Sequence, residues 1–284
     1  MYLPRITNTL EELLNEYSLE KTFPSLLYKA KFINRNGSII DKDNKVITIS
    51  NKIAELILND NILESISMVY MPDNMQYIIK THTGSPTTKT IDSNREEELV
   101  AMSLFKKKEY CNSDLDQFID YQSPIYRGND YRNIHIGKID LIAINHNTKE
   151  ILLMELKKYS SKETLLRCVT EIYTYYKQIN HEKLLLEVKD ILNNDNILEY
   201  KIKPSVLVFK NKHQHTQYIS SYYNNVTDLM DKLNVSMYII DSDVSFDNSN
   251  IDLYISKCKI IKIDKDKQNN EITGGYYGKS ENSR

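Results

Sequence analysis

The sequence predicts an α/β fold with a mixed sheet, and three stretches carry this prediction. Two runs of β-branched and aliphatic residues, 137–145 and 151–158, flank a short polar break and therefore predict an antiparallel hairpin. Apolar residues at helical spacing predict a long amphipathic helix over 162–179. The apolar run 204–209 then predicts a strand buried on both faces, as in a sheet that helices cover.

Residues 91–263 are predicted to form the main domain. A Ser or Asn cap followed by three glutamates predicts a helix that runs to Phe105, and 116–126 predicts the first strand of the sheet. The tail, 264–284, is charged and then rich in Gly and Ser, which is typical of a flexible end. After the hairpin and the long helix, the predicted elements are a helix over 182–192, the strand 204–209, a helix over 217–233 and a strand over 235–240.

A smaller α+β segment is predicted for residues 1–82, ahead of a polar linker over 83–89. Its predicted elements are a helix with a capping box at Thr9, a strand over 45–50, a helix capped at Asn51 and ending near Asp60, and a hairpin over 64–81. The segment carries no catalytic candidate. We therefore expect it to bind a substrate or a partner subunit, or to be purely structural. We also expect it to pack as a separate layer whose removal leaves the core of residues 91–240 soluble.

The composition limits the kind of protein. The chain has 284 residues, 27% of them charged, and a formal net charge of −2, so any nucleic-acid surface must be local rather than spread over the whole chain. No apolar run approaches membrane-spanning length, and the start lacks the apolar core of a signal peptide. Three scattered cysteines show neither zinc spacing nor a disulfide framework. We expect a cytoplasmic protein without a membrane partner.

The register of the hairpin brings charged residues together. With a four-residue loop over 146–149, Asn145 lies opposite Glu150, and the residue numbers of every opposed pair add to the same total. Asp140 therefore lies opposite Glu155. Because side chains alternate along a strand, Lys157 lies on the face of Glu155. The same register opposes Lys138 to Lys157, which is unfavourable. Either a bulge opens at Gly137, or the strands diverge, or the loop is off by one residue.

Two carboxylates and an amine within apolar strands point to a metal site. Buried charges are costly unless they are paired or bound to a metal, and two neighbouring carboxylates raise the pKa of one of them. Mg²⁺ would relieve this repulsion, polarise a phosphodiester and activate a water, while Lys157 could orient that water. The alternative is that the strand reaches the surface, where Glu155, Lys157 and Lys158 are solvated charges.

The arrangement of Asp140 and Glu155-Leu156-Lys157 on adjacent strands resembles the PD-(D/E)XK nuclease superfamily. The resemblance covers about residues 91–240 and implies a restriction-endonuclease-like core of order α-β-β-β-α-β. It also implies Mg²⁺, or Mn²⁺ as a substitute, held by Asp140, Glu155 and the Leu156 carbonyl. Ile139 stands where the motif name has Pro. The stretch 164–176 resembles uncharacterised bacterial proteins, a similarity that implies no activity.

The resemblance implies further site residues on two helices. In the superfamily the first core helix often carries a glutamate that leans into the metal site. We choose Glu97, because apolar residues follow it on one face, and Glu96 and Glu98 remain alternatives. All three glutamates are equally explained as partners of the helix dipole.

The helix over 162–179 has a polar stripe beside its apolar one, and three of its residues are expected close to the metal ligands: Glu171, Tyr175 and Gln178. In the superfamily this helix often carries a Gln, and some members have a Tyr one turn later. Here Glu171 stands where that Gln is expected. The alternative is an exposed face with aromatic residues.

Two functions from different classes follow. The first is a Mg²⁺-dependent endonuclease or exonuclease that hydrolyses phosphodiesters, in DNA rather than RNA, with restriction, phage defence or repair implied by the family. The second is a nuclease-fold binding or scaffold subunit that does not cut, which the near-neutral charge favours. Nucleic acid is the expected partner, with a homodimer or a partner subunit as further options. The most basic local patch flanks the strand 204–209 and comprises Lys201, Lys203, Lys210, Lys212, His213 and His215.

Overall fold

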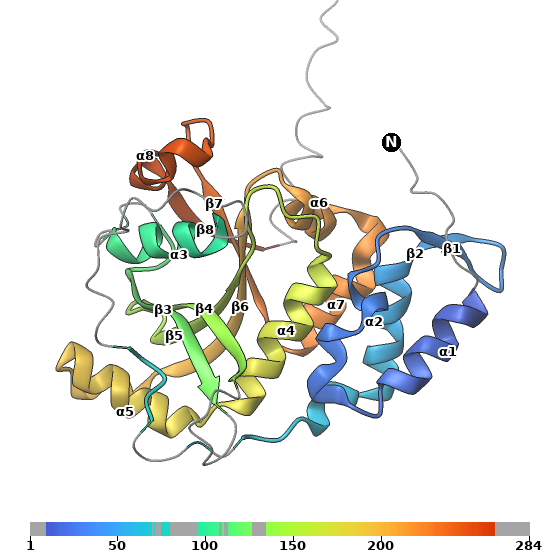
Figure 1. Ribbon diagram of the computed structural model, residues 1–284, viewed down its shortest axis with the longest axis horizontal. Helices are drawn as coiled ribbons and strands as arrows, with labels where there is room; N and C mark the ends of the chain where they lie inside the picture. The colour runs from blue at the N-terminus through green and yellow to red at the C-terminus, as the bar shows by residue number, and fades with distance from the viewer. Residues whose placement is uncertain are drawn as a thin grey trace, which may run out of the picture.

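The computed structural model describes residues 10–69, 71, 75–79, 96–107, 110, 113–126 and 135–264. Its centre is a six-stranded mixed sheet of order β3-β4-β5-β6-β7-β8 (Figure 1). The strands β3 to β5 are antiparallel neighbours, β5, β6 and β7 run parallel, and β8 is antiparallel to β7. Their bounds are β3 Gln117–Tyr126, β4 His135–Asn145, β5 Glu150–Leu156, β6 Lys201–Phe209, β7 Ser236–Asp241 and β8 Lys259–Ile263. The predicted α/β class with a mixed sheet is confirmed.

Helices cover both faces of this sheet. On one face, α3 (Glu96–Lys106) and α8 (Ile251–Lys257) share a hydrophobic cluster with alternate residues of the central strands, such as Leu152 and Met154. On the other face, α4 (Leu165–Gln178), α5 (His181–Leu192) and α7 (Asn224–Lys232) share a second cluster with the intervening residues, such as Ile151 and Leu153. Alternation along β5 therefore supplies both cores, and the strand is buried throughout.

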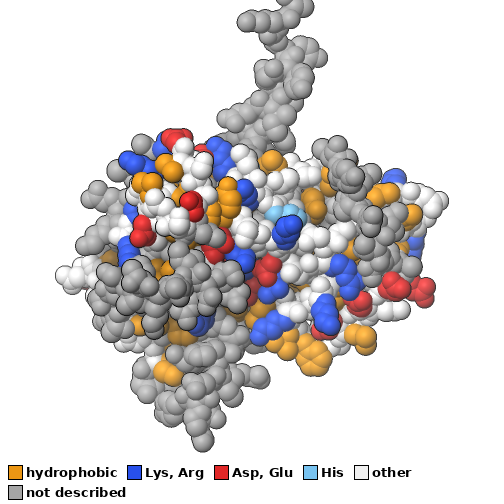
Figure 2. All heavy atoms as spheres, turned by 45° about the horizontal axis from the view of Figure 1, so that its top comes forward, with side chains coloured by type: hydrophobic (Ala, Val, Ile, Leu, Met, Phe, Trp, Pro, Cys, Tyr) orange, Lys and Arg blue, Asp and Glu red, His pale blue; other side chains and the backbone are white. Residues whose placement is uncertain are grey.

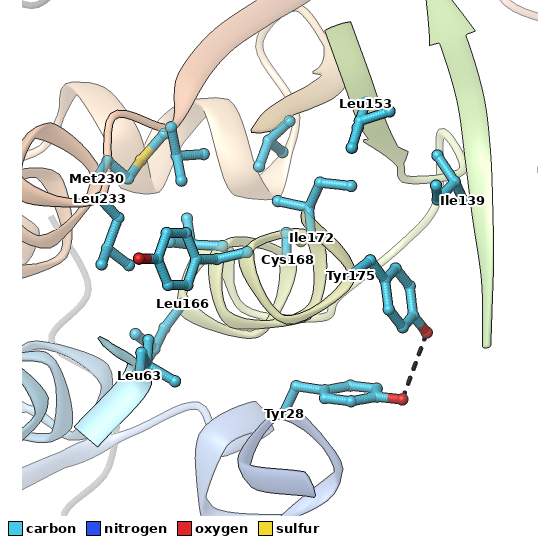
Figure 3. Packing of buried hydrophobic residues seen from close by; sticks show 14 of the residues in the cluster. Tyr28, Leu63, Ile139, Leu153, Leu166, Cys168, Ile172, Tyr175, Met230 and Leu233 are labelled. Atoms are coloured by element: carbon cyan, nitrogen blue, oxygen red, sulfur yellow. Dashed lines mark hydrogen bonds between the residues drawn. The ribbon is translucent and has the colours of Figure 1, made fainter. Parts of the chain in front are cut away.

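The N-terminal segment forms an outer layer on α4 and α7, away from α3 and α8 (Figure 1). It contains α1 (Leu10–Glu20), a two-stranded sheet of β1 (Ser38–Ile40) and β2 (Val46–Thr48), and α2 (Ile49–Asp60). Its buried side chains belong to the same cluster as those of α4. Figure 3 shows Tyr28 and Leu63 lying against Tyr175 and Leu166 of that helix.

The hairpin register is confirmed, and the strands diverge beyond it. Asn145 pairs with Glu150, and the pairing continues to Leu141 with Met154, where it ends. Lys157 follows the last residue of β5, and its backbone N–H donates to the Leu207 carbonyl of β6 at 3.2 Å. The unfavourable pairing with Lys138 is thus avoided by divergence of the strands. A register shift in the pairing of β4 with β3 lies beside Gly137.

Two predictions in the N-terminal segment are corrected. The cap of α2 is Thr48 rather than Asn51, because the Thr48 hydroxyl accepts the Asn51 N–H at 3.3 Å. The described residues of 64–79 form no hairpin. Instead, the backbone N–H groups of Tyr77 and Ile78 donate to Glu187 on α5, so the carboxylate of Glu187 takes the place of a partner strand. The remainder of that predicted hairpin lies outside the described residues.

Two further predictions differ toward the C-terminus. The predicted helix 217–233 is broken into α6 (His213–Ile219) and α7, because Ser220 leaves the helical conformation and caps the turn that joins them. The elements α8 and β8 were not predicted, since both are short and only two of the five residues of β8 are buried. The predicted caps at Thr9 and at Ser93 or Asn94 lie outside the described residues, as does nearly all of the predicted tail. Within the described part of the chain, no helix has the length and apolarity needed to cross a membrane.

Candidate metal centre

Three carboxylates from three elements meet where β4 and β5 separate. Glu97 on α3, Asp140 on β4 and Glu155 on β5 each offer an oxygen, and these oxygens all lie within 4.8 Å of one another. The hairpin register brings Asp140 to Glu155, because these residues continue the paired ladder by one step. The site therefore lies at the open end of the hairpin, with α3 on one side and α4 on the other.

The first turn of α3 is fixed by the glutamate that precedes the site residue. The Glu96 carboxylate accepts the Tyr159 N–H at 2.8 Å, which ties the helix to the loop after β5. Glu97, one residue on, faces the cluster, while Glu98 is exposed. Glu97, which we chose from the sequence with Glu96 and Glu98 as alternatives, is the glutamate that the fold directs toward Asp140 and Glu155.

Asp140 is fixed on both oxygens. Its Oδ2 accepts the backbone N–H of Leu156 at 2.9 Å, and its Oδ1 accepts Nε2 of Gln122 at 2.8 Å. Burial, followed by the charge of Glu97, raises the pKa of Asp140 to about 8, although Lys157 and the Leu156 N–H act in the opposite direction. Without a further cation, the carboxyl thus holds its proton far above its ordinary range.

Lys157 lies among the carboxylates. Its Nζ is 2.6 Å from Glu155, 2.9 Å from Glu163, 3.5 Å from Glu97 and 4.0 Å from Glu171. Burial opposes the charged form of this amine, but the surrounding carboxylates, Glu155 first, raise the pKa of Lys157 well above its usual value. The side chain is therefore an ammonium at neutral pH and bridges the α3 and α4 sides of the site.

The cluster contains more acidic than basic side chains. Burial, followed by Glu171, raises the pKa of Glu155 well above its usual value, and burial also raises the pKa of Glu97. Arg167 adds a second cation, 3.1 Å from Glu163 and 3.8 Å from Glu171. Among the described residues, no hydrogen-bond donor reaches the buried Oε2 of Glu171. Five carboxyl groups thus share two cations, and an additional cation would replace the protons that the raised pKa values favour on Asp140, Glu155 and Glu97.

Of the three residues of α4 that were expected near the metal ligands, two lie at the site and one does not. Glu171 contacts Lys157, and the Tyr175 hydroxyl donates to Glu171 Oε1 at 3.0 Å. Tyr175 also packs edge-on against Tyr28 of the N-terminal segment (Figure 3). Gln178 is buried one turn further on, and its Oε1 finds no hydrogen-bond partner in the described part of the chain. The structure brings Glu171 and Tyr175 to the site but not Gln178.

Two residues of the site were missed from the sequence. Gln122 donates to Asp140 from within β3, where it adopts a left-handed backbone with φ of 52°. Nothing in the sequence marks that conformation, which is rare for a residue other than glycine. Glu163 precedes α4 and contacts both Lys157 and Arg167. Its spacing of four residues from Arg167 was the available signal.

The donor set suits a hard divalent cation such as Mg²⁺. All candidate ligands are oxygens, and Mg²⁺ takes carboxylates together with water and substrate oxygens. The Leu156 N–H points toward Asp140 on β4. Because the N–H and C=O of one residue in a strand point to the same side, the Leu156 carbonyl faces this site rather than β6. Glu97, Asp140, Glu155 and Leu156 could therefore hold one ion.

Comparisons of the chain with protein-family models, with curated proteins and with solved structures found no match.

Proposed function

We propose that the protein is a metal-dependent nuclease with a restriction-endonuclease-like core, which hydrolyses phosphodiesters in DNA rather than RNA. One observation carries the proposal, the convergence of Glu97, Asp140 and Glu155 around the Lys157 amine at the open end of a hairpin. The element order α3-β3-β4-β5-α4, with α5 inserted before β6, also agrees with the α-β-β-β-α-β core that the motif implies.

The residues of the site divide into ligands and a catalytic amine. Glu97, Asp140 and Glu155 would hold the ion, which polarises the phosphodiester and lowers the pKa of a bound water when present. Lys157, held as an ammonium by Glu155 and Glu163, would orient the attacking water and stabilise negative charge that develops on the phosphate.

Substrate would approach from one side. The side chains of Glu155 and Lys157 are only 4% and 6% exposed, whereas those of Glu97 and Glu163 are 30% and 28% exposed. The site thus meets solvent between the first turn of α3 and the segment that joins β5 to α4. A phosphodiester that reached the cluster would pass these two glutamates, whose negative charge a bound ion would offset.

The alternative is a nuclease-fold subunit that binds nucleic acid or a partner without cutting. It is favoured by the charge balance, since Lys157 already neutralises part of the cluster and the chain has a net charge of −2. On the face in Figure 2, positive and negative side chains are interspersed rather than gathered in a basic stripe. Cleavage is the property that separates the two functions.

The test combines metal binding with cleavage. Mn²⁺ binding is measured by titration calorimetry, and cleavage of plasmid, single-stranded DNA and RNA is followed in Mg²⁺, Mn²⁺ and EDTA. Asp140→Asn removes one anionic ligand at nearly constant shape, and Glu98→Gln is the matched control on an exposed glutamate of α3. We expect metal binding and metal-dependent cleavage by the wild type and the control, with both lost or strongly weakened in Asp140→Asn. Cleavage in EDTA, or equal metal binding by Asp140→Asn, would exclude the proposed mechanism.

A further inference from the structure

A cavity of about 590 Å³ adjoins the segment that follows Lys157. Its walls come from four parts of the chain, one of which is the turn before α7 with Tyr223. The segment after β5 supplies Tyr159, Ser160 and Lys162, the loop before α6 supplies Lys212, and the N-terminal segment supplies Asn36. The cavity is therefore formed by tertiary packing and is absent from any one of these segments alone.

Two lysines line this cavity without an acidic counterpart. Neither Lys162 nor Lys212 forms an ion pair with a carboxylate anywhere in the described part of the chain, whereas other lysines do, such as Lys210 with Asp241 at 2.7 Å. The Lys212 amine instead lies over the Tyr159 ring, 3.7 Å from its centroid. That ring stacks on Phe246, so Lys212 is held at the cavity by a fixed aromatic platform.

The walls of the cavity are held together by hydrogen bonds. The Asn36 side chain donates to the Lys162 carbonyl at 2.9 Å, and its Oδ1 lies 3.0 Å from Nε2 of His213 on α6. Gln214 on α6 donates to the Glu163 carbonyl at 2.7 Å. These hydrogen bonds fix the backbone of the segments that contain Lys162 and Lys212. Ligand binding would therefore cost little conformational entropy of the backbone.

The cavity and the candidate metal centre share one short segment. Lys162 lines the cavity, and Glu163, the next residue, places its carboxylate 2.9 Å from the Lys157 amine. Tyr159 also lines the cavity, and its backbone N–H donates to the carboxylate of Glu96, the residue before Glu97. A strand held at the cavity would therefore lie beside the opening between α3 and the segment after β5.

We propose that this cavity binds a backbone phosphate of the nucleic-acid strand that is cut, with Lys162 and Lys212 as the phosphate contacts. The proposal rests on the proposed nuclease function and identifies how its substrate is held. Two amines at one cavity supply the positive charge that a phosphate requires, while the chain as a whole is slightly acidic. It also explains how an acidic active site attracts a polyanion, because the attraction comes from an adjoining site.

The test measures binding separately from cleavage. A fluorescein-labelled single-stranded DNA oligonucleotide is titrated in EDTA and followed by fluorescence anisotropy at several salt concentrations. The variant is Lys162→Gln with Lys212→Gln, and the control is Lys29→Gln, an exposed lysine that likewise lies over a tyrosine ring. Inorganic phosphate is added as a competitor, to separate a site for small anions from a site for a strand.

We expect the double variant to bind about a hundredfold more weakly, at about tenfold for each lysine, as for a hydrogen bond to a charged group. The slope of log affinity against log salt should fall by about 0.7 per lysine removed. The control should bind as the wild type does, and inorganic phosphate should compete only weakly. Unchanged affinity of the double variant, absence of DNA binding by the wild type, or full displacement by phosphate would each overturn the proposal.

Failure here and failure of the nuclease function give different results. If the double variant binds normally while Asp140-dependent cleavage persists, only the assignment of the cavity is wrong. If binding depends on the two lysines but no cleavage occurs in any metal, the cavity is correct and the protein is the binding subunit.

Discussion

The Tyr175 hydroxyl lies so close to the backbone of Gly137 that a β-carbon on residue 137 would clash with it, so the ring from α4 packs directly on β4 at this glycine. This contact places the hydroxyl within reach of Glu171, which in turn contacts Lys157. The glycine is therefore required by the approach of a neighbouring side chain. Gly137 lies on β4, three residues before Asp140. Its close contact with Tyr175 thus links the packing of α4 on β4 to the position of Glu171 at the site.

Gly137→Ala should destabilise the protein and disturb the site. A β-carbon would displace Tyr175 from Glu171, and overpacking of this kind typically costs about 1–3 kcal/mol. Urea unfolding measures the cost, and Mn²⁺ calorimetry reports the site. In the double variant with Tyr175→Leu, the loss of unfolding free energy should be smaller than the sum of the losses in the two single variants, because the leucine leaves room for the β-carbon. Full additivity would contradict the contact.

The left-handed backbone of Gln122 makes an unusual prediction about strand β3. Gln122→Ala loses the hydrogen bond to Asp140 and keeps the strained conformation, whereas Gln122→Gly loses the same bond and relieves the strain. The glycine variant should thus be the more stable of the two, by about 1 kcal/mol in urea unfolding. Both should bind Mn²⁺ more weakly than the wild type. A more stable alanine variant would contradict the assigned conformation, since alanine is otherwise favoured over glycine within a strand.

The protonation of Asp140 predicts how metal and pH act together. Its folded pKa is about 8, above the ordinary value of 3.8 that the unfolded chain has, so its contribution to stability is complete below the unfolded pKa and is lost as the pH rises through 8. In EDTA, the wild type should therefore lose stability over this range relative to Asp140→Asn. Mn²⁺ competes with the proton, so its stabilising effect should grow with pH.

Thermal unfolding in EDTA and in Mn²⁺, from pH 5 to pH 8.5, measures both effects. The Asp140→Asn variant is the control, because it cannot titrate at this position. A metal-induced rise in Tm that is equal at both ends of this range would contradict the raised pKa.

Lys157→Ala should separate stability from catalysis. The substitution leaves the buried carboxylate of Glu155 without its cation, whereas Glu163 keeps its ion pair with Arg167. Breaking a buried pair in this way typically costs about 3–5 kcal/mol. Mn²⁺ should restore much of that loss, while cleavage should remain slower by about 10²–10³-fold. Lys158→Ala, at the next and more exposed lysine, is the matched control for urea unfolding and for cleavage. Wild-type cleavage by Lys157→Ala would remove the amine from the mechanism.

Removal of residues 1–82 should destabilise the remaining domain, contrary to what the sequence alone suggested. The Thr164 N–H donates to Asn34 at 2.8 Å and its hydroxyl to the Ile33 carbonyl at 2.6 Å, while Tyr28 covers Tyr175. Truncation would expose the outer face of α4 and free its N-terminus. We expect the truncated chain to aggregate or to unfold at lower urea than the full chain. A truncated chain as stable as the full one would show that the segment is a separate layer.

The sequence by itself determined the α/β class, the hairpin register and the opposition of Asp140 to Glu155. These features are local, because alternation, loop length and helical spacing are properties of neighbouring residues. Only the tertiary structure decided that Glu97 rather than Glu96 or Glu98 faces the site, since that depends on where the first turn of α3 is tied to a distant loop. The left-handed Gln122 and the break between α6 and α7 likewise depend on contacts that no local pattern encodes, because long-range packing can outweigh local preference.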